Sequence, residues 1–128
     1  MDREWWKRYL EQAKAEFHGL RFSPLTGLAG VKHVKFVHGQ NSGAGAISLA
    51  NHWGAKRIIL LGYDCQKTGG KSHWHGDHPR GLGNAGSIGT WPLQFYTLSK
   101  RINTEIINCS RETALTMFER RPLEEVLK

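Results

Sequence analysis

Residues 2–17 carry apolar side chains at the spacing of an amphipathic helix. The apolar positions recur every three or four residues, at Trp6, Leu10, Ala13 and Phe17, and charged residues fill most of the others. Asp2 is suited to cap the start of this helix, and Gly19 to end it in a left-handed conformation. We therefore predict an N-terminal helix within a segment spanning residues 1–19. Its aromatic stripe is expected either to pack into the core or to form a dimer face.

The pattern then changes to that of a strand, a helix and a second strand. Residues 20–32 contain proline and glycines and predict a loop, and residues 31–38 are rich in β-branched and aromatic side chains, which predicts a strand. A helical pattern covers 43–53. The continuous apolar run at 57–62 is typical of a strand that is buried on both faces of a parallel sheet. Together these segments predict a βαβ unit over 33–62.

The rest of the chain consists of a long polar loop followed by a segment with helix and strand patterns. Residues 63–90 are rich in glycine and histidine and show no periodicity, and an unstructured loop of this length is usually functional. Residues 91–128 predict a helix, a strand and a final helix, at 91–102, 104–108 and 122–127. The whole chain therefore predicts one α/β domain over residues 1–128. We expect a three-layer arrangement with a short, mainly parallel sheet and helices on both faces.

Composition narrows the class of protein. The chain has 128 residues with 39% hydrophobic and 23% charged side chains, which is typical of one globular domain. No stretch approaches the ~20 apolar residues that span a bilayer, and the N-terminus lacks the apolar core of a secretory signal. These observations predict a cytoplasmic protein without a membrane partner. Cys65 and Cys109 are too few for a disulfide framework and are expected to be buried thiols.

The net charge of +7 indicates an anionic partner, which could be a phosphate, a nucleotide or a nucleic acid. The basic residues are spread along the chain without forming a dense basic arm, so nucleic-acid binding is the less favoured of these interpretations. We expect a phosphate-bearing small molecule, most simply a nucleotide.

The ligand should bind beyond the carboxyl ends of the parallel strands, where three polar segments are expected to meet. These segments are residues 39–45, 62–89 and 108–114. The first is a glycine-rich turn that feeds a helix N-terminus, an arrangement that favours phosphate, although small residues could equally serve packing there. Predicted ligand-binding residues are Gly39, Gln40, Asn41, Ser42, Gly43, Asp64 and Lys71. Asp64 is suited to a ribose hydroxyl or to Mg²⁺.

A second candidate site lies in the string His73-Trp-His75-Gly-Asp77-His78. Its spacing matches the H-x-H-x-D-H signature of metallo-β-lactamase-fold hydrolases. No histidine follows His78 and no aspartate follows Asp77, so the downstream ligands of that fold are missing and we reject that assignment. Two interpretations stay open for His73, His75, Asp77 and His78. They could be catalytic, with histidine as a general acid or base, or they could bind a divalent metal such as Mg²⁺ or Zn²⁺.

Four groups of residues occur in the order of a known family. They are Asn41-Ser-Gly-Ala-Gly-Ala-Ile47, Gly54-Ala-Lys-Arg-Ile-Ile-Leu-Leu-Gly-Tyr-Asp64, Gly70-Lys-Ser-His-Trp-His-Gly-Asp-His78, and Ile107-Asn-Cys-Ser110 with Ala114-Leu115 and Leu123-Glu-Glu-Val-Leu127. Together they resemble the C-terminal half of the MptE-like family, the proteins related to 6-hydroxymethylpterin pyrophosphokinase, which has small phage and prophage relatives. The Asn-Ser-Gly turn and the Gly-x-Asp strand end are also similar to bacterial sialyltransferases that use a CMP-sugar. The resemblance covers residues 33–127.

The resemblance implies a Rossmann-like fold and a nucleotide or nucleotide-sugar ligand. It would put residues 41–43 against the nucleotide, Asp64 near its sugar or a metal, and residues 73–78 near the reacting phosphate. The family's N-terminal α/β portion is replaced here by one helix, so a homodimer is expected to complete the crevice. The expected function is that of a phosphoryl, pyrophosphoryl or glycosyl transferase relative from a phage or prophage, in the host cytoplasm. The alternative is a non-catalytic phage accessory module that sequesters a nucleotide or binds a host protein.

Overall fold

The computed structural model of the chain describes residues 3–71, 76, 78–80, 82 and 85–128. Three of the candidate catalytic and metal-binding residues, His73, His75 and Asp77, lie outside the described residues. His78 lies within them.

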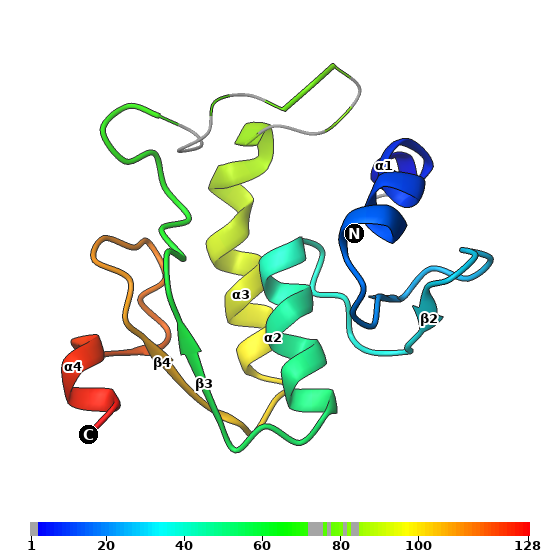
Figure 1. Cartoon of the computed structure of the whole chain (residues 1–128). Helices are drawn as coiled ribbons and strands as arrows, with labels where there is room; N and C mark the ends of the chain where they lie inside the picture. The colour runs from blue at the N-terminus through cyan, green and yellow to red at the C-terminus, as the bar shows by residue number, and fades with distance from the viewer. Residues whose placement is uncertain (1–2, 72–75, 77, 81, 83–84) are drawn as a thin grey trace.

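Three short parallel strands form the larger sheet. β3 (Arg57–Leu60), β4 (Glu105–Asn108) and β5 (Glu119–Arg120) pair in the order β3-β4-β5. In this register Leu60 lies opposite Asn108, so the carboxyl ends of β3 and β4 meet at one edge of the sheet (Figure 1). The predicted strands at 57–62 and 104–108, and their parallel pairing, are confirmed.

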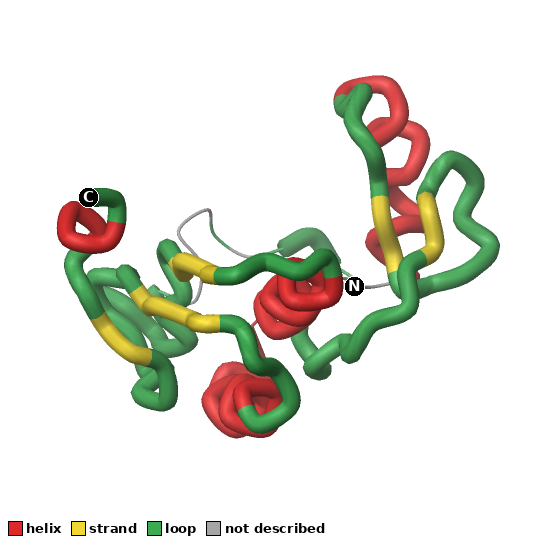
Figure 2. The backbone as a smooth tube through the Cα atoms, turned by 90° about the horizontal axis from the view of Figure 1, so that it is seen from below, coloured by secondary structure: helices red, strands yellow, loops and turns green. Residues whose placement is uncertain are grey.

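Two helices cover one face of this sheet. α2 (Ser42–His52) and α3 (Trp91–Ser99) lie side by side against β3 and β4, and the 3₁₀ helix η1 (Ala85–Thr90) leads into α3 (Figures 1 and 2). The core that joins these layers consists of Ala44, Ile47, Leu60, Phe95, Leu98, Leu115 and Phe118, all at most 7% exposed. Burial of such side chains stabilises each by roughly 1.5–3 kcal/mol, which makes this cluster the main source of stability.

The end of the chain returns to the carboxyl edge of the sheet. α4 (Leu123–Val126) follows β5 after Arg121 and Pro122, within the helix predicted at 122–127. β5 was not predicted, because two consecutive charged residues carry no strand pattern.

The N-terminal third forms a second, smaller assembly. It contains α1 (Arg3–Glu16) and a two-stranded parallel sheet of β1 (Phe22–Ser23) and β2 (Lys32–His33). The strand predicted at 31–38 is therefore much shorter, and it pairs with β1 rather than with β3. The sequence pattern indicates an extended backbone but not its partner, and β1 lies inside the segment predicted as a loop. β2 and β3 consequently lie in separate sheets, and the single-sheet βαβ unit predicted over 33–62 is not formed.

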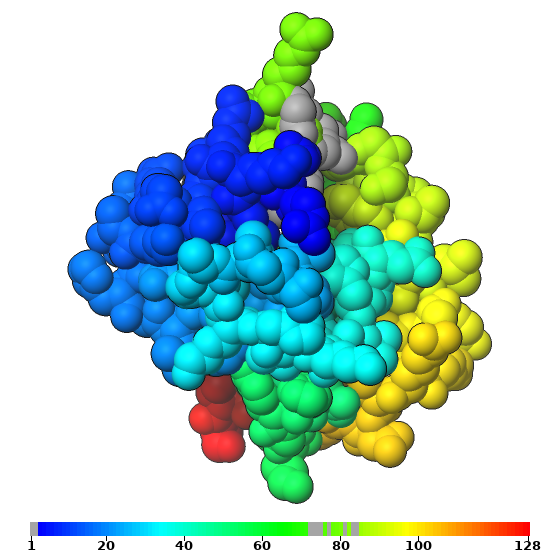
Figure 3. Space-filling model, turned by 90° about the vertical axis from the view of Figure 1, so that its right-hand side faces the viewer, coloured from blue at the N-terminus to red at the C-terminus, as the bar shows by residue number. Residues whose placement is uncertain are grey.

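The predicted aromatic stripe is only partly buried. Of its four apolar positions Trp6 is buried, Leu10 and Ala13 are half-buried, and Phe17, which follows the end of α1, is 54% exposed. Figure 3 shows the N-terminal segment, from blue to cyan, spread over one side of the molecule beside the yellow α3 region. The stripe therefore contributes one side chain to the interior rather than the whole face.

The described chain is a mixed α/β structure with helices and two small parallel sheets. None of its described helices is both long enough and apolar enough to cross a membrane. Cys65 and Cys109 are free thiols, and both are partly rather than fully buried.

Candidate ligand-binding site

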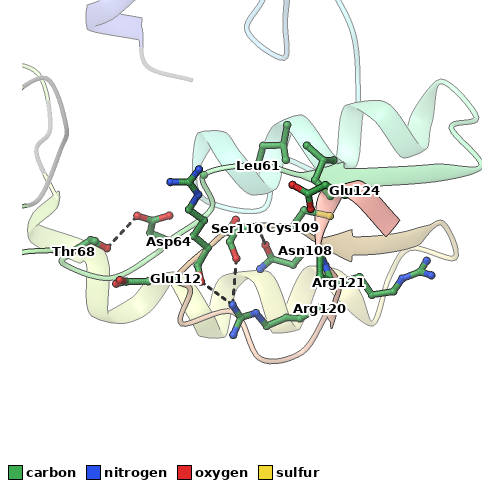
Figure 4. A pocket seen from close by; sticks show the side chains of 14 residues that line it. Leu61, Asp64, Thr68, Asn108, Cys109, Ser110, Glu112, Arg120, Arg121 and Glu124 are labelled. Atoms are coloured by element: carbon green, nitrogen blue, oxygen red, sulfur yellow. Dashed lines mark hydrogen bonds between the residues drawn. The ribbon is translucent and has the colours of Figure 1, made fainter. Parts of the chain in front are cut away.

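A cavity of about 820 Å³ opens at the carboxyl edge of the larger sheet (Figure 4). Three segments line it: the one that follows β3, the one that follows β4, and the connection from β5 to α4. The lining residues are Leu61, Gly62, Asp64, Thr68, Asn108, Cys109, Ser110, Arg111, Glu112, Arg120, Arg121, Pro122, Leu123 and Glu124. This volume falls within the ~300–1,000 Å³ that is usual for small-molecule sites.

Hydrogen bonds join the two strand ends that line the cavity. The backbone N–H of Tyr63 donates to Ser110 Oγ at 2.8 Å, and Thr113 Oγ1 donates to the carbonyl of Tyr63 at 2.6 Å. The N–H of Ala114 donates to the carbonyl of Asp64 at 2.8 Å. The predicted convergence of residues 62–89 with residues 108–114 is thus confirmed for the part of the first segment that follows β3 directly.

A buried amide holds the second strand end in place. Asn108 is 1% exposed, its Nδ2 donates to Thr113 Oγ1 at 3.1 Å, and its Oδ1 accepts the N–H of Ser110 at 3.0 Å. Buried polar groups that are satisfied in this way fix one conformation, because breaking them leaves a donor or acceptor without a partner. The segment after β4 is therefore a rigid wall of the cavity.

Three arginines and three acidic residues line the cavity, and the arginines are held differently. Arg120 Nη2 donates to the carbonyls of Ser110 at 3.3 Å and Arg111 at 3.0 Å. Arg121 Nε is buried and donates no hydrogen bond to a described residue, although Glu119 Oε1 lies 3.2 Å from it. Arg111 itself is exposed. Arg120 is thus engaged by the backbone and Arg121 is paired with Glu119, which leaves the exposed Arg111 to meet an anion.

Asp64 is the one predicted ligand-binding residue that lines this cavity. Its Oδ2 accepts the hydroxyl of Thr68 at 3.1 Å, on the side of the site where Glu112 also lies (Figure 4). Burial, assisted by the negative charge of Asp64, raises the pKa of the neighbouring Cys65 thiol to about 11. Cys65 is therefore a neutral thiol at physiological pH and a poor nucleophile.

The glycine-rich turn before α2 is built mainly for packing. Asn41 Oδ1 caps α2 by accepting the N–H of Ala44 at 2.8 Å, and Asn41 Nδ2 donates to Gln94 Oε1 at 2.7 Å. A Cβ on Gly43 would lie 3.0 Å from Tyr63 Cε1. Asn41 is therefore the cap of α2.

The turn adjoins the cavity wall without forming part of it. Tyr63 Oη donates to the carbonyl of Gly43 at 3.4 Å, which connects the turn to the end of β3. The lining does not include Gly39, Gln40, Asn41, Ser42, Gly43 or Lys71. Their contact with a ligand stays a prediction.

His78 lies against the N-terminal helix instead of the cavity. It lines a groove of about 410 Å³ with Pro79, Leu82 and one face of α1 that includes Trp5 and Phe17. No group of three or more histidine, cysteine or acidic residues is placed to hold a metal ion within the described residues. The proposed roles of His73, His75 and Asp77 concern residues outside them.

None of the three cavity arginines was a predicted site residue, and only Arg111 lies within a predicted segment, 108–114. Arg120 and Arg121 reach the site because β5 pairs with β4, and that pairing could not be read from a two-residue strand. The available signal was the Arg-Arg-Pro sequence before the final helix, which by itself indicates only an exposed helix start.

No family model matches the chain, and no curated protein or solved structure is significantly similar to it.

Proposed function

We propose that this protein binds a nucleotide or nucleotide sugar through its phosphate groups, in the cavity at the carboxyl edge of the larger sheet. The observation that carries this proposal is the position of the cavity. It lies where the parallel strands β3 and β4 end, which is the usual place of ligands in open α/β sheets.

The chemistry of the lining supports a ligand that carries both an anion and hydroxyl groups. Arg111 supplies an exposed guanidinium group, which matches phosphate geometry. Asp64 offers a carboxylate that suits a ribose hydroxyl or a divalent cation.

We extend this proposal to the family and the biological setting. The resemblance to MptE-like proteins supports a Rossmann-like architecture and a phosphoryl, pyrophosphoryl or glycosyl transfer reaction in a phage or prophage context. Bound Mg²⁺ or Zn²⁺ would then assist at Asp64 or at residues 73–78. A second copy of the chain in a homodimer would contribute to the crevice, and the protein would act in the host cytoplasm.

A thermal-shift screen tests the binding proposal. The panel contains nucleoside mono-, di- and triphosphates and sugar nucleotides, each with and without Mg²⁺ or Zn²⁺. A ligand at ~100 times its dissociation constant is expected to stabilise the protein by about 2.7 kcal/mol. The Arg111→Ala protein should lose most of this shift, and the Arg101→Ala protein, altered between α3 and β4, should keep it. A panel without any stabilising ligand, or shifts that survive the Arg111→Ala substitution, would overturn the proposal.

A non-catalytic binding module is the second candidate. The observation that favours it is the location of His78, which lines the groove beside α1 and not the cavity. The cavity lining contains no histidine among the described residues, so a general acid or base there would have to be one of its carboxylates. Tight binding of a panel ligand without turnover over a long incubation would support this candidate, whereas hydrolysis or group transfer would support the enzyme.

A further inference from the structure

The side chain of Arg120 holds the loop after β4 through the backbone carbonyls of that loop. The side chain comes from the neighbouring strand β5, and its Nη2 donates to the carbonyls of both Ser110 and Arg111. Figure 4 shows these two bonds converging on the guanidinium group from one side of the loop. One cationic group therefore fixes the orientation of two consecutive peptide units.

The orientation of those peptide units decides where their N–H groups point. The chain contains no cis peptide bond between described residues, and in a planar trans peptide the N–H points opposite to the carbonyl. The carbonyls of Ser110 and Arg111 point toward Arg120, so the N–H groups of Arg111 and Glu112 point away from it. No hydrogen bond between described residues uses either of these two N–H groups.

Two successive N–H groups that point to the same side of a loop can bind one anion between them, as in phosphate-binding loops. Here the two groups belong to residues that line the cavity, and the exposed guanidinium of Arg111 is carried by the same loop. Glu112 does not block the site with its own charge, because its carboxylate extends away from Arg120, toward Thr68 (Figure 4).

We propose that Arg120 is a positioning residue that orients the Ser110–Glu112 loop so that the N–H groups of Arg111 and Glu112 bind a phosphate oxygen. This inference rests on the proposed function, and it locates the phosphate subsite within the cavity. In this arrangement the guanidinium of Arg120 bonds to backbone carbonyls and does not contact the ligand.

Amide NMR tests this assignment directly, because a 14.5 kDa chain gives resolved ¹⁵N–¹H spectra. Inorganic pyrophosphate and ADP are titrated into the wild-type protein. We expect the amide resonances of Arg111 and Glu112 to move downfield, as they do when an N–H gains an anionic acceptor. Binding in the cavity that shifts Asp64 and Ser110 but leaves these two amides unmoved would overturn the inference and leave the proposed function standing. If neither probe, nor any ligand of the wider panel, perturbs cavity residues, the proposed function fails as well.

Variants separate positioning from simple attraction between charges. Arg120→Ala should weaken pyrophosphate binding at least about tenfold and abolish the downfield shifts of Arg111 and Glu112, since the loop loses its anchor. Arg120→Lys keeps the positive charge but lacks the planar fork, so we expect weaker binding and reduced shifts. Arg101→Ala should behave as wild type. An Arg120→Lys protein with wild-type affinity and wild-type amide shifts would show that only the charge matters. If Arg120→Ala does not fold, the wild-type titration and the lysine variant decide the question.

Discussion

Gly43 shows how one missing side chain joins the turn before α2 to the core. A Cβ at this position would lie 3.0 Å from Tyr63 Cε1 and 3.1 Å from Phe95 Cζ, and both rings are held by packing. We predict that Gly43→Ala lowers the free energy of unfolding by about 1–2 kcal/mol, through overpacking. Gly86→Ala is the matched control, because a methyl group added there would meet no heavy atom within 4 Å. Urea denaturation measures the free energy of unfolding of both variants. Equal values for the two would contradict the packing role of Gly43.

Cys65 makes stability depend on pH in the alkaline range. Burial and the nearby charge of Asp64 raise the thiol pKa to about 11 from an ordinary value of 9.0. The folded state therefore holds this proton more tightly than the unfolded state. Its stabilising contribution is complete below about pH 9 and is lost as the pH rises toward 11.

We predict that the free energy of unfolding falls between pH 9 and pH 11 in the wild-type protein, and falls less steeply in Cys65→Ala. Burial also raises the pKa of Tyr63, so a residual slope should remain in the variant. Cys109→Ala controls for the loss of a thiol. Denaturant titrations at several pH values check this, and identical pH slopes in the Cys65→Ala and wild-type proteins would contradict it.

At the scale of elements, Thr113 connects the ends of β3 and β4. Its hydroxyl donates to the carbonyl of Tyr63 and accepts both Asn108 Nδ2, at 3.1 Å, and the N–H of Leu115, at 3.0 Å. Thr113→Val keeps the shape but leaves these buried groups unpaired. We predict a loss of about 2–4 kcal/mol, measured by chemical denaturation.

Thr97→Val is the control for this substitution. The hydroxyl of Thr97 donates to the carbonyl of Leu93 on the exposed side of α3, where water can replace it. Its stability should change by no more than about 0.5 kcal/mol. A Thr113→Val protein as stable as the Thr97→Val protein would mean that the network does not hold the cavity wall.

The elements also show what the sequence could predict. α2, α3, β3 and β4 followed from their apolar patterns and the helix cap, because these segments bury long apolar runs in the core. β5 did not, since its pairing with β4 is determined by the backbone of neighbouring chain segments rather than by its own side chains. The position of Asp64 followed from the end of β3, whereas Arg120 of β5 entered the site only through that unpredicted pairing.

At the scale of the whole molecule, the core cluster and the cavity both lie in the later two thirds of the chain. Every member of the core cluster lies between Ala44 and Phe118, and every lining residue of the cavity lies between Leu61 and Glu124. The N-terminal segment adds the buried Trp6 and a contact between the rings of Phe22 and Trp53, 4.9 Å apart. The periodicity of α1 correctly predicted a helix, but it could not show that Trp6 would be the one fully buried position of its stripe.

This division predicts that a protein lacking residues 1–38 still folds and still binds the ligand of the cavity. It keeps the whole core cluster and Asn41, the cap of α2. We expect a lower melting temperature, because Trp6 and Phe22 are lost, but a single cooperative transition with retained helical circular dichroism. Any ligand found for the full chain in the thermal-shift screen should bind with a dissociation constant within about threefold of the full-length value, a difference of under about 1 kcal/mol. A truncated protein that folds but no longer binds would place the ligand in the groove beside α1, with His78, because that groove is the described concave surface that the truncation removes.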